Sequence, residues 1–157
     1  MSTVTIYPSS AYSIGCSGYP SNPARYSYID ESSPATTDYN FKTGVSTGQD
    51  LFGMSAHGQS TGVISNLAFS VYYTTQGNPG SCQLKVRIAA NGTVYNFGSA
   101  LGAVSNFKTG TVNLTTNPYT GAAWTWSDIT NAKFGYYLTA STSGKNVIVA
   151  QMQITIT

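Results

Sequence analysis

The sequence predicts an all-β protein: an antiparallel two-sheet β-sandwich or jelly roll with roughly eight to ten strands. Two observations favour this class. Apolar and polar residues alternate through 82–88 and 148–156, as they do in strands that turn one face to a core. In addition, the sequence shows no long run with the 3.6-residue spacing of an amphipathic helix. The pattern leaves a closed barrel open as an alternative, and it does not give the order of the strands.

The first half of the chain contains short and weakly marked strands. Val4 and Ile6 alternate with polar neighbours and predict a first strand that ends at Pro8. Residues 8–24 are rich in Pro, Ser, Gly and Asn, so we expect turns throughout this segment. Further short strands are expected at 25–29, 38–42 and 51–56.

The second half contains the clearer strands. Apolar side chains at every second position of 67–73 share one face, and Asn91-Gly92 is a strong signal for a two-residue hairpin. The strands expected here are 67–73, 82–88, 93–97, 111–115, 133–141 and 148–156. The apolar faces of the best strands predict four core residues, Phe69, Ile88, Leu138 and Ile154. The last strand is expected to present a free edge to a neighbouring molecule.

The stretch 117–129, NPYTGAAWTWSDI, contains both tryptophans of the chain and separates two expected strands. Its N-P and T-G dipeptides predict turns. Ser127 has the character of a helix N-cap and an acidic residue follows it, so one short helical turn is expected near 127–131. Trp124 and Trp126 would share one face of an extended chain. We expect them to close one end of the core, and a paired platform that stacks on a sugar ring is the alternative.

The composition argues against several classes of protein. Charged residues make up only 8% of the 157 residues and the net charge is +2, whereas a nucleic-acid binder needs clustered Lys and Arg. No apolar run approaches the length of a membrane span. Residues 1–12 lack the regions of a secretory signal, so synthesis in the cytoplasm is expected. The length fits a single domain over 1–157.

No set of residues in the sequence forms a recognisable catalytic centre. His57 is the single histidine, and neither a nucleophile elbow nor another local motif provides it with a partner. The glycines do not match the spacing of a phosphate-binding loop. We therefore expect no enzymatic activity and no cofactor.

Acidic residues and cysteines leave two alternatives open. Asp30, Glu31 and Asp38 lie close together in the sequence and are weak candidates for Ca²⁺ ligands, because carboxylate oxygens suit that ion. Side chains that accept backbone N–H groups in turns are the favoured interpretation, so no metal is expected. Cys16 and Cys82 are expected to be two buried thiols, although the sequence does not exclude a disulfide between them.

Tyrosine is frequent, with twelve residues in a chain of little charge. Tyr72 and Tyr137 fall opposite the apolar faces of their strands, so we expect them to point outward. Outward tyrosines suit protein interfaces and ligand surfaces, and they also stabilise sheets as cross-strand pairs. The residues considered as interface or glycan contacts are therefore Tyr72, Tyr137, Trp124 and Trp126.

Two segments have a distinctive residue order: IDESSPATTDY at 29–39, and NPYTGAAWTWSDI at 117–129 followed by KFG at 133–135. Together they resemble a β-sandwich module found in tailed-phage structural proteins of the decoration or fibre type and in some bacterial surface proteins. The resemblance spans about 4–157 and brings no catalytic residues with it. It implies a virion-surface protein, made in the host cytoplasm, that contacts other virion proteins and forms homo-oligomers. The alternative is a carbohydrate-binding or host-adhesion module that contacts a host surface glycan.

Overall fold

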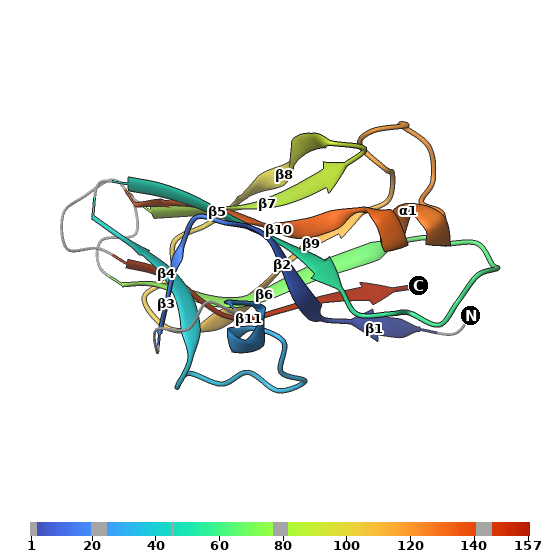
Figure 1. Cartoon of the computed structure of the whole chain (residues 1–157). Helices are drawn as coiled ribbons and strands as arrows, with labels where there is room; N and C mark the ends of the chain where they lie inside the picture. Colours follow the sequence, from blue (N-terminus) through green and yellow to red (C-terminus); the bar gives the residue numbers. More distant parts are fainter. Residues whose placement is uncertain (1–2, 20–24, 45, 77–81, 141–145) are drawn as a thin grey trace.

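The computed structural model describes residues 3–19, 25–44, 46–76, 82–140 and 146–157. These residues form two antiparallel β-sheets packed face to face, with one short α-helix at one end of the sandwich (Figure 1). The expected all-β sandwich is therefore confirmed. The described residues contain eleven strands, slightly more than the expected number.

The described residues form eleven strands and two short helices. The strands are β1 (Val4–Ile6), β2 (Pro8–Ile14), β3 (Ser17–Tyr19), β4 (Tyr39–Thr43), β5 (Ser46–Met54), β6 (Leu67–Gln76), β7 (Cys82–Ala90), β8 (Thr93–Leu101), β9 (Lys108–Leu114), β10 (Lys133–Ala140) and β11 (Asn146–Ile156). The helices are the 3-10 helix η1 (Arg25–Tyr28) and the α-helix α1 (Trp126–Asn131). The helical turn expected near 127–131 is therefore confirmed.

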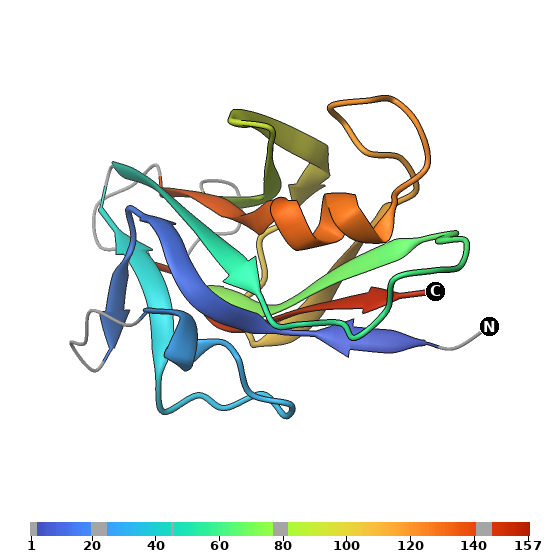
Figure 2. The ribbon, with the colours of Figure 1, turned by 45° about the vertical axis from the view of Figure 1, so that its right-hand side comes forward.

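The order of the strands is that of a jelly roll. One sheet has the order β3-β4-β11-β6-β9, with β1 also paired to β11, and the other has the order β2-β5-β10-β7-β8. From β4 to β11 the strands pair first with last: β4 with β11, β5 with β10, β6 with β9 and β7 with β8. This nested pairing places most consecutive strands in opposite sheets. The two layers are also visible from a second direction (Figure 2).

β11 is a central strand of the six-stranded sheet. It pairs with β6 along one side, and with β4 and then β1 along the other. Between β4 and β1, the backbone N–H of Met152 donates to the carbonyl oxygen of Ile29 at 2.9 Å and fills the gap. The expectation of a free edge at the last strand is therefore wrong, because partners from both halves of the chain flank it.

A β-bulge changes which residues of β11 face the core. The register with β6 shifts between Val149 and Gln151, so the side chains before and after the shift alternate out of phase. Val147 and Val149 join the core before the bulge, as Met152 does after it. The uniform alternation expected through 148–156 is therefore correct only after the bulge.

Two N-terminal segments differ from the expected structure. The described part of 8–24, expected to consist of turns, contains β2 and β3. β2 is an edge strand, where Pro8 is tolerated because one side of the strand needs no hydrogen bonds. The segment 25–29, expected to be a strand, begins with η1. Tyr28 and Ile29 are both buried, and two consecutive buried side chains do not fit a strand with one core face.

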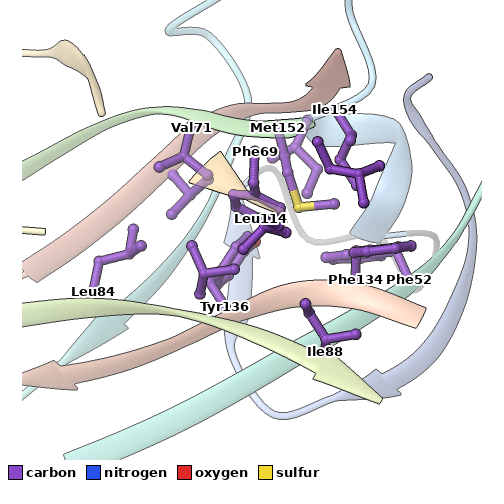
Figure 3. Packing of buried hydrophobic residues seen from close by; sticks show 14 of the residues in the cluster. Phe52, Phe69, Val71, Leu84, Ile88, Leu114, Phe134, Tyr136, Met152 and Ile154 are labelled. Carbon is purple, nitrogen blue, oxygen red and sulfur yellow. The ribbon is translucent and has the colours of Figure 1, made fainter. Parts of the chain in front are cut away.

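The core lies between the two sheets and is rich in aromatic side chains (Figure 3). Phe52 of β5 and Phe134 of β10 are paired in register, fully buried and close together in it. All predicted core residues are 0% exposed, which confirms the prediction for Phe69, Ile88, Leu138 and Ile154. Burying a side chain of this size contributes about 1.5–3 kcal/mol.

Candidate functional site

The N-cap of α1 is Thr125, and the expected N-cap, Ser127, lies inside the helix. The Thr125 hydroxyl accepts the backbone N–H of Asp128 at 3.1 Å, and the Asp128 carboxylate accepts the N–H of Thr125 at 2.9 Å. This capping box satisfies two donors at the start of the helix. Burial alone would raise the pKa of Asp128, but hydrogen bonds from Thr125 and Asn117 outweigh it and hold that pKa below its ordinary value.

The loop before α1 is closed by hydrogen bonds around Asn117. The N–H of Asn117 donates to the carbonyl of Ala122, and the N–H of Gly121 donates to the carbonyl of Asn117, both at 2.8 Å. The Asn117 side chain is 2% exposed; its Oδ1 accepts the N–H of Tyr119 at 2.9 Å, and the same side chain bonds Asp128. The turns predicted here are confirmed, and they fix the backbone at Tyr119.

A cleft of about 520 Å³ lies beside this loop, and we call it the α1 cleft. Its residues come from places far apart in the sequence: Tyr12 of β2, the Asn91-Gly92 hairpin, Tyr119, the end of α1 and Lys133. Asn91 has a φ of 49° and Gly92 a φ of 77°, the left-handed pair that a two-residue hairpin needs. The predicted hairpin is therefore confirmed, and it forms part of the cleft wall.

The two tryptophans lie in different environments. Trp124 is 3% exposed and packs against Phe134 of the core, with the ring centroids 5.9 Å apart. Trp126 begins the helix, is partly exposed, and lies against His57 with the ring centroids 4.9 Å apart. Both tryptophans line a groove of about 480 Å³ with residues 60–64. Trp124 therefore closes the end of the core, as expected, and offers little ring surface to a ligand.

His57 has partners that the sequence did not indicate. Its Nδ1 accepts the N–H of Gln59 at 3.1 Å, so in the neutral ring Nε2 is the donor. Nε2 lies 2.9 Å from the hydroxyl of Thr130 on α1, and Trp126 covers part of the ring. These contacts hold the chain after β5 against the helix and give His57 a structural role.

The acidic residues Asp30, Glu31 and Asp38 are neighbours in space. Burial raises the pKa of Asp30 and of Glu31, and the charge of nearby Asp38 raises both further. Within the described ranges, no group of three His, Cys, Asp or Glu side chains is arranged so that it could hold a metal ion. The calcium alternative therefore gains no geometric support from this cluster.

Tyr72 and Tyr137 lie on the outer faces of different sheets, as the alternation predicted. Tyr72 of β6 stacks on Phe107, with the ring centroids 5.2 Å apart. Tyr137 of β10 lies under the guanidinium of Arg87, whose central carbon is 4.1 Å from the ring centroid. The two tyrosines therefore belong to two separate surfaces.

The outer face of the six-stranded sheet contains rows of uncharged side chains that are paired in register across β1, β11, β6 and β9. The rows are Thr5, Thr155, Ala68 and Asn113; Gln153, Ser70 and Thr111; and Gln151, Tyr72 and Thr109. We call these residues the uncharged face. The hydroxyls of Ser70 and Thr111 are hydrogen bonded at 3.0 Å within it. Hydroxyl and amide groups therefore cover most of this side of the sandwich. Gln151 is the buried exception: it is 7% exposed, and its side-chain amide donates to the carbonyl oxygen of Glu31 at 2.6 Å.

The outer face of the five-stranded sheet is basic instead. Lys85, Arg87 and Lys133 alternate with core residues on β7 and β10, so their side chains point away from the core. The Arg87 side chain bonds residues of strands on both sides of β7. Its Nε donates to Asn96 of β8 at 2.8 Å, and its Nη1 donates to Gln49 of β5. The two faces of the sandwich therefore differ in charge.

A buried polar network joins the two sheets. The Tyr136 hydroxyl of β10 donates to Asp50 of β5 at 3.3 Å and accepts the side-chain amide of Asn40 of β4 at 2.9 Å. The other carboxylate oxygen of Asp50 accepts the backbone N–H groups of Gly15 and Cys16, each at 2.9 Å. Burial raises the pKa of Asp50, although these hydrogen bonds oppose the shift. The network fixes the point where the chain crosses from β2 in one sheet to β3 in the other.

Cys16 and Cys82 are both buried and both free, which confirms the expectation of two thiols. Burial raises the pKa of the Cys16 thiol far above its ordinary value, and the nearby Asp50 charge raises it further. A thiol in this state is a poor nucleophile, because the reactive form is the thiolate.

No protein-family model matches this sequence, and no curated protein matches it. The resemblance to tailed-phage structural proteins therefore stays a prediction. In the part of the chain that the structure describes, no helix is long and apolar enough to cross a membrane. Two surfaces, the uncharged face and the α1 cleft, are the candidate functional sites.

Proposed function

We propose that the protein is a non-enzymatic structural component of a virion surface, of the capsid-decoration or fibre type, that works through protein–protein contacts. The uncharged face is the observation that carries this proposal. Charged residues are depleted from the centres of protein interfaces, because a charge without a partner is costly to remove from water. A face of hydroxyl, amide and tyrosine groups avoids that cost.

The partner of the uncharged face is a second copy of the chain. In a twofold homodimer the same patch meets itself, so any charge at its centre would face a like charge nearby. The rows around Ser70 contain no charged residue, and Glu31 lies beside them at Gln151. Lys85, Arg87 and Lys133 would oppose self-association through the other sheet. A stable homo-oligomer of this kind buries more than about 1,000 Å² at its interface.

The setting on a virion is supported by the resemblance of 29–39, 117–129 and 133–135 to tailed-phage structural proteins. The proposal includes synthesis in the host cytoplasm and incorporation at the particle surface, beside other virion proteins. A charged fraction of only 8% also suits a subunit whose surface is covered by neighbours in an assembly.

Sedimentation velocity over a range of concentrations, and co-sedimentation with the parent particle, test this proposal. The variant Ser70→Glu places a charge in the middle row of the uncharged face and should weaken self-association about tenfold or more. Gln83→Glu adds the same charge to an exposed position on β7 and should leave association unchanged. A protein that stays monomeric and does not bind the particle, or a Ser70→Glu variant that associates like the wild type, would refute the proposal.

A further inference from the structure

The α1 cleft has the size and the construction of a small-ligand site. Its volume of about 520 Å³ lies within the range of about 300–1,000 Å³ that such sites occupy. Its lining joins β2, the β7–β8 hairpin, the loop around Asn117 and the end of α1, so the site exists only in the folded chain. The helix and this loop lie side by side at one end of the molecule (Figure 2).

Two tyrosines give the cleft exposed aromatic surface. Tyr12 is 59% exposed and Tyr119 is 50% exposed. Among the described residues only one other tyrosine, Tyr19, is exposed to this degree, so two of the three line the same cleft. The face of an aromatic ring is electron-rich and attracts C–H groups that carry a partial positive charge. The cleft therefore has surfaces that suit the C–H face of a sugar ring.

The polar groups of the cleft are held in place before any ligand binds. The buried Asn117 side chain accepts the N–H of Tyr119 and bonds Asp128, which is itself held by the capping box. The amide nitrogen of Asn131 donates to the carbonyl of Ser127 at 2.9 Å, which fixes the orientation of its side chain. Groups that are already ordered lose little conformational entropy on binding.

The charges of the cleft favour a neutral ligand. Its lining contains one carboxylate, Asp128, and one amine, Lys133, whose formal charges cancel. A phosphate-rich ligand requires a surplus of cations. A purely apolar ligand would remove the amide of Asn91 and the amide oxygen of Asn131 from water without giving them partners. A neutral ring that has many hydroxyl groups satisfies the amides and also presents C–H groups to the tyrosines.

We propose that the α1 cleft binds a neutral saccharide, with a sugar ring stacked on Tyr119 and its hydroxyl groups bonded to Asn91 and Asn131. The residues of the uncharged face lie on the six-stranded sheet, and they are not among the residues that line the cleft. This binding therefore goes beyond the proposed assembly role. Either proposal can fail while the other holds.

The test is retention of the full chain on an array of neutral glycans built from glucose, galactose, mannose and N-acetylglucosamine, printed beside sialylated counterparts. We expect retention on neutral glycans, and titration calorimetry with the best of them then gives the affinity. Tyr119→Ala should lower this affinity about tenfold or more, because it removes the stacking ring. Tyr119→Phe keeps the ring and should bind like the wild type.

Tyr19→Ala is the matched control, because it removes an exposed tyrosine from β3 in the other sheet. Its affinity should equal that of the wild type, and the melting temperatures of all variants show whether they are folded. Retention on no neutral glycan, or on sialylated glycans alone, would overturn the proposal. An unchanged affinity in Tyr119→Ala would overturn it as well.

Discussion

Asp50→Ala tests how the two sheets are held together. Asp50 lies on β5 with 0% exposure, and its carboxylate accepts hydrogen bonds from the N–H groups of Gly15 and Cys16 and from the hydroxyl of Tyr136. The Cys16 thiol is a further, weaker donor. The N–H of Gly15 also donates to the carbonyl of Gln49 at 2.7 Å, so it keeps an acceptor in the variant. The two strong donors that lose their acceptor are the N–H of Cys16 and the hydroxyl of Tyr136.

The size of the effect follows from these two donors. A buried donor without an acceptor costs about 1–3 kcal/mol, so the free energy of unfolding should fall by about 2–6 kcal/mol. A domain has a total unfolding free energy of about 5–15 kcal/mol, so the variant loses a large part of it. Urea denaturation gives this free energy, with the fluorescence of the buried Trp124 as the readout.

Asp50→Asn is the control, because its side-chain oxygen can still accept the N–H of Cys16. It should unfold at a urea concentration between those of the wild type and Asp50→Ala, and it provides the measurement if the alanine variant does not fold. An alanine variant whose unfolding free energy lies within about 1 kcal/mol of the wild-type value would show that the network contributes little to stability, and would refute this prediction.

Four further outcomes are expected. Leu138→Ala should lower the unfolding free energy by about 2–5 kcal/mol, because it leaves a cavity in the core; an unchanged melting temperature would count against this packing. Thr125→Ala removes the N-cap of α1 and should cost about 0.5–2 kcal/mol in the same urea assay, whereas Ser127→Ala should cost less. Burial raises the pKa of Asp50 above its ordinary value of 3.8, so the folded state holds this proton more tightly than the unfolded state. Wild-type stability should therefore fall relative to Asp50→Asn as the pH rises from 3.8 through the raised pKa; a difference that is constant with pH would contradict this. His57→Ala should leave self-association and glycan retention intact, and the loss of either without unfolding would give His57 a functional role.

Sequence alternation predicted those strands that have one face in the core and one in water. In β7, the residues Cys82, Leu84, Val86 and Ile88 all point inward, because each sheet of a sandwich has only one buried face. The same rule fails at β2, where residues 9–12 are all exposed and no alternation exists to be detected. Backbone pairing with β5, and not a pattern of side chains, makes this segment a strand.

The candidate sites depend on contacts that no local pattern contains. The sequence marks the turns at Asn91 and Asn117, but only the fold brings them into one cleft with Tyr12. Thr125 and Ser127 are both suitable N-caps by residue type, and the capping box that Thr125 forms with Asp128 selects the first. The uncharged face was partly visible in the sequence, because Tyr72 and its polar neighbours alternate with core residues on β6.

The central position of β11 determines when the strands of its sheet can pair during synthesis. β1, β4 and β6 all leave the ribosome well before the strand that pairs with each of them. Their backbone donors and acceptors stay without that partner while residues are added at about 5–20 per second, and such edges invite pairing with other chains. The five-stranded sheet waits in the same way for β10, the central strand that joins β5 to β7, but β10 is complete before β11 begins. The six-stranded sheet is therefore completed last, and nascent chains that stop before residue 146 should depend on chaperones to stay soluble.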